Sequence, residues 1–482
     1  MATQQPLPAP TSMRLDSTNI QGDILSGLPK KTEIFYFFRI TNDEDFRRRF
    51  RNFAPLVKSV DQVAKDRDEI QEHKRKDERL GTKPHLIPLV GVNIAFSHLG
   101  FKELKIDDTK LIDTAFLRGQ RLDAANLGDK GTGSGDNFVP DWEPAFKEEI
   151  HGVILVAGDS HTSVNKQLWQ IEEIFGDSIY KVTAVRGDAR PGDLSAHEHF
   201  GYLDGVSNPA IIGFDKNPLP GPAPINPGNI IVGQEGDASK ADRAPWMFDG
   251  SFLVFRYLFQ KVPEFDDFVD KNALKVPGLT HKEGADLLGA RLVGRWKSGA
   301  PIDLTPFQDD AELGGDPKRN NNFSFAAERD FQKLCPFASH IRKTFPRADF
   351  EEAGIPTESH RIMRRGIQFG PEVTRQEKKE KKTMHGRGLL FACYQSSITN
   401  SFQLLQQGWA NNAAFPFTEK TPQVPGLDAI IGQGPGRQLS GIDPNNPATE
   451  LVLTQDWVIP RGGEYFFSPS IKSLKDTIAL SA

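Results

Sequence analysis

The chain has 482 residues, of which 38% are hydrophobic and 26% are charged, a composition typical of a water-soluble globular protein. The chain contains 59 Lys and Arg residues and 64 Asp and Glu residues. The resulting net charge of -5 argues against a surface that binds nucleic acid or another polyanion. No apolar run approaches the roughly 20 residues that a membrane-spanning helix needs. We therefore expect no contact with a membrane.

The N-terminal segment and the cysteines give no sign of the compartment. Residues 1–12 lack the basic start and the apolar block of a secretory signal, so we expect no signal peptide in the chain as written. Cys335 and Cys393 match no zinc or redox spacing, and we expect them to be buried free thiols.

The first half of the chain has the pattern of a β-α-β-β-α-β unit. Short runs rich in aromatic and β-branched residues predict strands at 33–40, 89–96, 150–157 and 180–186. Apolar residues at three- and four-residue spacing predict one or two helices within 43–79 and another at 161–175. This order is that of a ferredoxin-like domain, in which helices cover one face of an antiparallel sheet.

The second half repeats this architecture without repeating the sequence. Strands are predicted at 251–261, 361–369, 387–395 and 456–467, and helices at 263–291 and 396–409. The intervening segment 189–244 is dense in Gly, Pro, Asn and Asp, as expected of a long connection. We predict an α+β fold of two ferredoxin-like domains, comprising residues 1–215 and 216–482.

Asp204 lies in this connection between Gly201 and Gly205. Asp-Gly is a common turn dipeptide, so a plain turn is the simplest interpretation. Glycine also lets a backbone approach a flat ligand closely, which would present Asp204 at the face of that ligand. Alternatively, His197 and His199 would share one face of an extended segment and could ligate a non-haem metal together with Asp204.

Two further segments combine apolar residues with unusual polar ones. His340 is followed by Arg342, Lys343 and Arg347, and these cations would suit a ligand that carries carboxylates, such as haem with its propionates. A single histidine is nevertheless most often a structural residue. Arg364 shares a strand face with apolar residues, and a buried arginine is rare unless it is paired or functional.

Two other features have weaker signals. The Gly-rich segments 131–136 and 432–436 lack the Gly-Lys-Ser/Thr ending of phosphate-binding loops, so we interpret them as ordinary loops. Trp409 at the end of the helix predicted at 396–409 is either a packing residue or a redox-active indole, and the sequence alone favours packing.

Taken together, these segments resemble the dye-decolorizing peroxidase family, and in particular its longer fungal-type members. The Gly-x-x-Asp-Gly signature is present at 201–205 and continues into Asn208-Pro209. The block around His340, Ile-Met-Arg-Arg-Gly at 362–366, Gly-Leu-Leu-Phe at 388–391 and Gln-Gln-Gly-Trp at 406–409 follow in the family's order. The resemblance extends from about residue 19 to the last predicted strand.

The resemblance implies a haem peroxidase that reduces hydrogen peroxide and oxidises dyes, phenolics and similar aromatic donors. Haem b would be bound mainly by the C-terminal domain, with His340 as the iron ligand and Asp204 and Arg364 as the groups that cleave peroxide. The resemblance further implies that Leu389 and Phe391 line the distal side and that Trp409 is a surface electron relay, and the position of Arg342 beside His340 suggests that it contacts the cofactor. Phe345 and Phe369 depart from residues common in relatives, and Phe369 removes a possible tyrosyl radical at that position.

The resemblance also suggests an extracellular protein that is a monomer or a homodimer. Because a carboxylate stays ionised at a pH where an imidazole is protonated, a peroxidase that uses Asp204 as its base is expected to work best at acidic pH. Two alternatives stay open at this point. One is a non-haem metal enzyme that uses His197, His199 and Asp204, and the other is a haem-binding protein without turnover.

Overall fold

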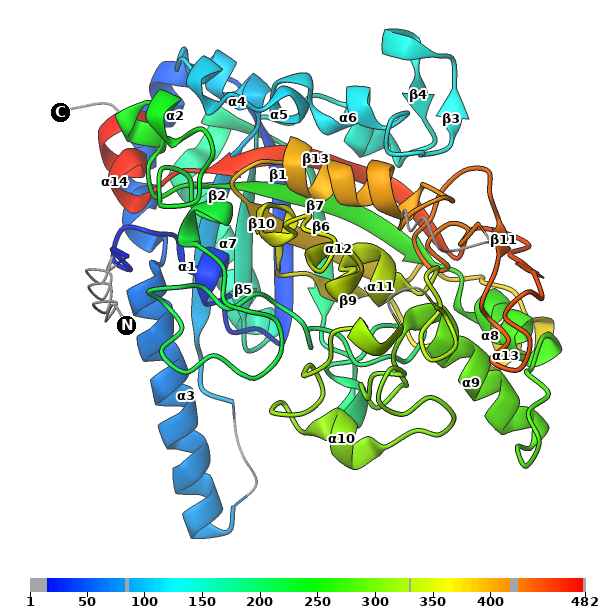
Figure 1. Cartoon of the computed structure of the whole chain (residues 1–482). Helices are drawn as coiled ribbons and strands as arrows, with labels where there is room; N and C mark the ends of the chain where they lie inside the picture. Colours follow the sequence, from blue (N-terminus) through cyan, green and yellow to red (C-terminus); the bar gives the residue numbers. More distant parts are fainter. Residues whose placement is uncertain (1–14, 83–85, 329–330, 417–423, 480–482) are drawn as a thin grey trace, which may run out of the picture.

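A nine-stranded antiparallel sheet connects the two halves of the chain (Figure 1). The computed structural model describes residues 15–82, 86–328, 331–416 and 424–479. The strand order is β6-β1-β5-β2-β13-β7-β10-β8, and β9 pairs with β10 outside this path. The halves join where β2 pairs with β13 at Phe96 and Phe467.

The N-terminal half contributes the first four strands of this order: β1 (Thr32–Ile40), β2 (Val90–Phe96), β5 (Gly152–Gly158) and β6 (Ile179–Asp188). Its main helices are α2 (Asp43–Phe53), α3 (Val60–Leu80) and α7 (His161–Phe175). The spatial order β6-β1-β5-β2 places the fourth, first, third and second strands side by side, which is the arrangement of a ferredoxin-like sheet. The predicted fold class is confirmed.

The C-terminal half repeats the arrangement with β7 (Ser251–Gln260), β8 (Met363–Arg364), β9 (Ile367–Phe369), β10 (Gly388–Gln395) and β13 (Val458–Ser468). Its longer helices are α8 (Val262–Lys271), α9 (His281–Val293) and a π-helix at Thr399–Ala410, and the short helix α11 is His340–Thr344. Besides 3-10 helices and a second π-helix at Leu474–Ile478, the short elements of the two halves are α1 (Gly22–Leu25), α4 (His98–Glu103), α5 (Thr114–Arg118), α6 (Gln120–Asp123), β3 (Gly131–Thr132), β4 (Val139–Pro140), α10 (Ala311–Gly315), α12 (Ala348–Glu351), α13 (Arg375–Glu380), β11 (Gln438–Leu439), β12 (Leu451–Val452) and α14 (Ile471–Ser473).

Local sequence explains where the longest helix begins and ends. Ser59 and Gln62 form a reciprocal capping box at the start of α3, which satisfies backbone N–H groups that have no partner within the helix. Gly81 ends α3 with a φ of 61°, a left-handed conformation that glycine adopts without steric cost. Figure 1 shows α3 projecting away from the body of the molecule.

Three predicted elements differ from the observed ones. The strand predicted at 361–369 is divided into β8 and β9, because the chain at Gly366 comes so close to β10 that a Cβ would lie 2.7 Å from the carbonyl oxygen of Leu390. The helix predicted at 263–291 is interrupted between α8 and α9. The helix predicted at 396–409 is observed as a π-helix, whose wider turns sequence periodicity does not reveal.

The core occupies both faces of the sheet. On the inner face, Phe35 and Phe37 of β1 each lie with their ring centroid 4.9 Å from that of Phe255 of β7, so the two half-sheets pack against each other. The first strand of the order also meets β9, which pairs with β10 near the other end. A Cβ on Gly187 of β6 would lie 2.3 Å from Ile367 of β9, which shows that the sheet curls into a barrel.

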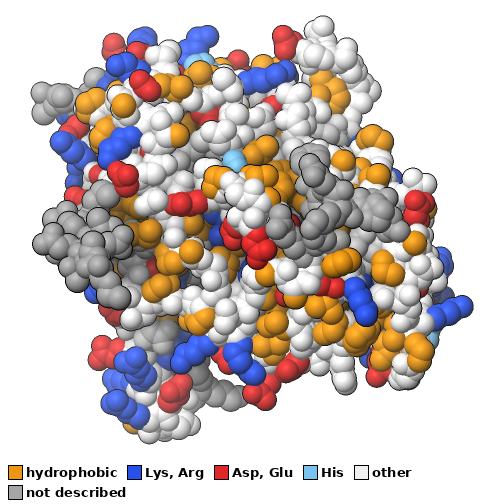
Figure 2. Space-filling model, in the orientation of Figure 1, with side chains coloured by type: hydrophobic (Ala, Val, Ile, Leu, Met, Phe, Trp, Pro, Cys, Tyr) orange, Lys and Arg blue, Asp and Glu red, His pale blue; other side chains and the backbone are white. Residues whose placement is uncertain are grey.

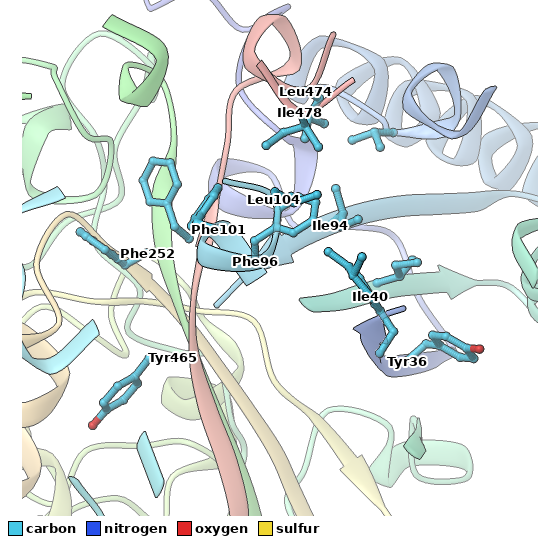
Figure 3. Packing of buried hydrophobic residues seen from close by; sticks show 14 of the residues in the cluster. Tyr36, Ile40, Ile94, Phe96, Phe101, Leu104, Phe252, Tyr465, Leu474 and Ile478 are labelled. Atoms are coloured by element: carbon cyan, nitrogen blue, oxygen red, sulfur yellow. The ribbon is translucent and has the colours of Figure 1, made fainter. Parts of the chain in front are cut away.

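On the outer face, helices cover the alternate side chains of the same strands. Figure 3 shows this outer cluster, in which Ile94 and Phe96 of β2 lie beside Leu474 and Ile478 from the C-terminal end of the chain. Because the end of the chain completes the core beside the N-terminal strands, the two halves share one hydrophobic interior.

The surface shows the balance of charge expected from the composition. On the face drawn in Figure 2, acidic and basic side chains are interspersed. None of the helices in the described part of the chain is long and apolar enough to cross a membrane.

Candidate active site

A cavity of about 280 Å³ lies on the outer face of the C-terminal half-sheet. Its floor is formed by alternate residues of β7 and β10, including Leu258, Leu389 and Phe391, whereas the intervening Leu390 and Ala392 are fully buried in the core behind them. The remaining walls come mainly from α11, the loop around Asp204, the segment before β8, the π-helix Thr399–Ala410 and the segment 430–433. The β-strand alternation of the sequence therefore separates core residues from cavity residues.

His340 is the first residue of α11 and lines this cavity. Its Nδ1 atom lies 2.9 Å from Oδ2 of Asp428, whose side chain is fully buried. The other carboxylate oxygen of Asp428 accepts hydrogen bonds from the backbone N–H groups of Ile430 and Ile431. Because Asp428 accepts the Nδ1 proton, Nε2 of His340 is left as the unprotonated nitrogen that can act as a ligand.

The charge and hydrogen bond of Asp428 also set the acidity of His340. Burial by itself lowers the pKa of this imidazole, but Asp428 outweighs burial and holds the pKa above its ordinary value. A more basic imidazole is a stronger donor to a metal ion.

Asp204 and Arg364 form an ion pair in the same cavity. Nη1 of Arg364 donates a hydrogen bond of 2.6 Å to Oδ1 of Asp204, and the two side chains are 30% and 29% exposed to the cavity. Burial raises the pKa of Asp204, but the charge and the hydrogen bond of Arg364 outweigh burial and hold the pKa below its usual value. Asp204 therefore stays a carboxylate to lower pH than an ordinary aspartate does.

The loop and the strand that carry this pair are fastened to each other. Asn208 accepts a hydrogen bond from the backbone N–H of Arg364 across 3.0 Å and donates one to its carbonyl oxygen across 3.3 Å. Gly201 and Gly205 have φ angles of 98° and 77°, which explains why glycine flanks Asp204 in the sequence. Asn208 thus fixes the distance between two side chains that are far apart in the sequence.

Comparison with known proteins decides what kind of site this is. Residues 19–191 match the model of the DyP dimeric alpha+beta barrel domain, and residues 198–416 match that of the Dyp-type peroxidase C-terminal domain. "Peroxidase 2" of Mycetinis scorodonius is 42% identical over 99% of this chain and 90% of its own length. The chain belongs to the dye-decolorizing peroxidase family.

Other members of the dye-decolorizing peroxidase family match over a similar length. The AauDyP1 peroxidase of Auricularia auricula-judae is 43% identical and covers 97% of this chain and 87% of its own. Among solved structures, a mutant of the dye-decolorizing peroxidase of Pleurotus ostreatus is 55% identical, with a TM-score of 0.92 over 97% of this chain and all of its own. The fungal-type resemblance is thereby confirmed.

Dye-decolorizing peroxidases are haem enzymes, and the cavity of this chain has the chemistry to hold a haem. Arg295, Arg347 and Arg361 line the cavity, and within the described residues no carboxylate forms an ion pair with any of them. Burial and the neighbouring Arg295 and Arg361 hold the pKa of Arg347 well below its ordinary value. This concentration of positive charge fits a cofactor that carries two carboxylates.

Arg342 does not take part in this cluster, contrary to expectation. Its side chain is fully buried outside the cavity lining and forms two hydrogen bonds of 2.7 Å to the carboxylate of Asp349. Its remaining N–H groups donate to the backbone carbonyl oxygens of Glu328, Phe331 and Cys335. All its donors are engaged, so the expected cofactor contact of Arg342 is corrected to a structural role.

Trp409 lies at a different depth from the one expected. It is only 5% exposed and stacks on Phe415 with a centroid distance of 4.9 Å, so it is not a surface residue. Its ring also lies against His360, which lines the cavity, with a centroid distance of 5.4 Å. The structure thus places Trp409 one side chain behind the cavity wall.

The non-haem metal site has no support in the geometry. Nε2 of His199 donates a hydrogen bond of 2.8 Å to the carbonyl oxygen of Phe369, and burial lowers the pKa of His199 to about 4. In the described portion of the chain, no three His, Cys, Asp or Glu side chains are grouped so as to hold a metal ion. His197 and His199 therefore do not form a ligand set with Asp204.

Sequence reasoning missed Asp428, Arg361 and Glu198, all of which contribute to the site. Asp428 lies in a loop rich in Gly and Pro with no periodic pattern, and its partner His340 is remote in the sequence. Arg361 stands three residues before Arg364 in the segment that alternation had singled out, so that pattern held a usable signal.

Proposed function

We propose that this chain is a peroxidase that binds haem b through Nε2 of His340 and uses Asp204 and Arg364 to cleave hydrogen peroxide. Asp428 holds the imidazole in the required tautomer, and Arg295, Arg347 and Arg361, which line the cavity, would bind the haem carboxylates. When bound, haem supplies a redox centre that takes two oxidising equivalents from peroxide and passes them on one electron at a time.

Asp204 moves the proton in this proposal. As a carboxylate it accepts a proton from hydrogen peroxide and returns that proton to the oxygen atom that leaves as water. Arg364 donates one N–H to Asp204 and has further donors for the peroxide oxygens. Its fixed positive charge in a largely apolar cavity stabilises the negative charge that develops as the O–O bond breaks.

The reducing substrates are proposed to be dyes, phenolics and similar aromatic donors. A relative of 42% identity and TM-score 0.86 has been solved as a complex with 2,6-dimethoxyphenol. In this chain Leu389 and Phe391 line the same cavity as Asp204 and Arg364, and we propose that they limit the size of donor that can enter it. Bulky dyes would therefore deliver electrons without entering the cavity, by way of the buried Trp409 and of His360, which lines the cavity.

The observation that carries the proposal is that His340 and the Asp204–Arg364 pair line one cavity although they come from three separate segments. The test is an absorption spectrum of the haem-loaded protein before and after one equivalent of peroxide, followed by addition of a phenol. We expect a haem spectrum that changes with peroxide and returns with the phenol. A haem spectrum that does not respond to peroxide would mean haem binding without turnover.

A further inference from the structure

We propose that Glu198 is a positioning residue that fixes the geometry of Asp204 for proton transfer. This inference rests on the proposed function of Asp204. Glu198 lines the same cavity as Asp204 and begins the tight loop that carries it.

The carboxylate of Glu198 folds back onto its own loop. Oε2 accepts the backbone N–H of Phe200 and Oε1 that of Tyr202, both at 2.8 Å. The backbone N–H of Glu198 in turn donates to the carbonyl oxygen of Tyr202 across 3.0 Å. The backbone N–H of Asp204 donates to the carbonyl oxygen of Ala196 across 2.9 Å, so the loop closes on itself directly before the catalytic carboxylate.

The backbone of this loop needs such a constraint. Gly201 lies between the two N–H groups that Glu198 binds, and its φ of 98° belongs to a region in which glycine has wide freedom. Fixing the backbone of a glycine costs conformational entropy, which contacts within the loop must offset. Glu198 supplies two of these contacts with one side chain.

Glu198 is itself anchored on both sides. Arg190 donates a hydrogen bond of 2.5 Å to the carbonyl oxygen of Glu198 and binds the carboxylate of Glu372 with two more. On the cavity side, Nε2 of Gln260 in β7 donates to Oε2 of Glu198 across 2.5 Å. The carboxylate therefore connects the Asp204 loop to the rigid floor of the cavity.

The partners of Glu198 indicate positioning and not charge neutralisation. Among the described residues no cation forms an ion pair with its carboxylate, so its three hydrogen bonds come from uncharged donors. The Oε1 atom of Gln260 is buried without a hydrogen-bond partner, which means that the Gln260 amide is oriented by Glu198 alone. Burial and the nearby charge of Asp204 raise the pKa of Glu198, as expected for a carboxylate held by neutral donors.

The test compares Glu198→Ala and Glu198→Gln with Asp204→Asn in the haem-loaded enzyme. We expect the rate constant for the reaction with peroxide to fall by about 10- to 100-fold in Glu198→Ala, because the acceptor for the peroxide proton loses its fixed position. Glu198→Gln retains one acceptor oxygen and should fall less. Turnover at saturating peroxide with a slow dye should stay within about twofold, since dye oxidation then limits the rate.

A second readout does not depend on activity. Hydrogen exchange of the amides of Phe200 and Tyr202 should accelerate by about five- to tenfold in Glu198→Ala, because both lose their hydrogen bond, whereas in Glu198→Gln only the amide that faces the new NH2 group should accelerate. Glu264→Gln is the matched control, since Glu264 also binds a backbone N–H, that of Thr383, but lies outside the cavity lining. It should leave both the peroxide reaction and the exchange of residues 200 and 202 unchanged.

The outcomes distinguish the positioning role of Glu198 from the proposed function of Asp204. If Asp204→Asn slows the peroxide reaction and the Glu198 variants react like the wild type, the positioning role is wrong. If Asp204→Asn itself reacts like the wild type, the proposed function of Asp204 fails. Should Glu198→Ala not fold, Glu198→Gln and Gln260→Met decide the question, because each removes contacts of the same network while keeping side-chain volume.

Discussion

Asp428 accepts the Nδ1 proton of His340 across 2.9 Å, although the two residues lie in separate segments of the chain. The aspartate is fully buried and is held in turn by backbone N–H groups, so the direction of the imidazole is fixed before any ligand binds. This contact connects the fold of the C-terminal half to the electronic properties of the proposed iron ligand.

Replacing Asp428 with Asn should therefore change the reduction potential of the bound haem as well as the stability of the fold. An amide makes His340 a weaker donor, so we expect a more positive reduction potential and about 10- to 100-fold weaker haem retention. Spectroelectrochemistry and haem transfer to a competing protein measure these effects. Asp237→Asn, at a buried carboxylate paired with Arg243, is the control that should alter stability without moving the potential. An unchanged potential in Asp428→Asn would remove this residue from the haem site.

Asp204→Asn should slow the reaction with peroxide by about 10²- to 10⁴-fold, the range for loss of a general acid–base group. The haem spectrum should stay as in the wild type, because Asn keeps the shape of the side chain and Asp204 is not the proposed ligand. Stopped-flow mixing with peroxide measures the rate. Wild-type kinetics in this variant would show that another group moves the proton.

The pH dependence of the reaction with peroxide should be set by the pKa of Asp204, which Arg364 lowers. Since Arg364 holds the pKa of Asp204 below its usual 3.8, the peroxide reaction should persist to acidic pH and be lost only as the pH falls through that lowered value. In Arg364→Leu, burial is opposed only by the backbone hydrogen bond of Gly205 and the charge of His340, so the pKa of Asp204 should rise and the acid limb of the normalised rate profile should move to higher pH. Glu198 and His340 are the other ionisable groups that interact with Asp204. A limb that stays in place or moves to lower pH would contradict the assignment.

The buried pair of Arg342 and Asp349 should stabilise the fold without affecting the haem. Asp349→Asn leaves the Arg342 charge buried without its ionic partner, so the free energy of unfolding should fall by about 3–5 kcal/mol. Denaturant unfolding followed by circular dichroism measures this loss. Haem affinity at a temperature where the variant is folded should match the wild type. A selective loss of haem would restore Arg342 as a cofactor contact.

Trp409→Phe tests the proposed electron path. Phenylalanine preserves most of the packing against Phe350, His360 and Phe415 but cannot readily be oxidised. Oxidation of bulky dyes should fall by about tenfold, a loss of about 1.4 kcal/mol in transition-state stabilisation, while oxidation of 2,6-dimethoxyphenol should change little. If the variant oxidises both donors as fast as the wild type does, or slows both by the same factor, Trp409 has only a packing role.

The sequence predicted the fold well because strand alternation and helical periodicity are local properties. Phe35 and Phe37 face one side of β1 while Tyr36 and Phe38 face the other, as their alternation indicates. The division of 361–369 into two strands was not predictable, because it depends on how closely Gly366 approaches a strand that comes later in the chain.

For the site, a motif singled out Asp204 and an unusual burial pattern singled out Arg364, and the structure brings the two together in one cavity. Arg342 was misplaced because proximity in sequence was taken for proximity in space. Two residues along a helix differ by about 200° in direction, so Arg342 points away from the cavity that His340 faces. Asp428 could not be found from sequence, since only the folded chain brings it to His340.

The most direct test of the central claim is the absorption spectrum of haem-loaded His340→Ala. If Nε2 of His340 binds the iron, this variant should lose the spectrum of the histidine-ligated wild type, and added imidazole should restore it by occupying the space of the missing side chain. An identical spectrum in the variant and the wild type, unaffected by imidazole, would show that another residue binds the iron.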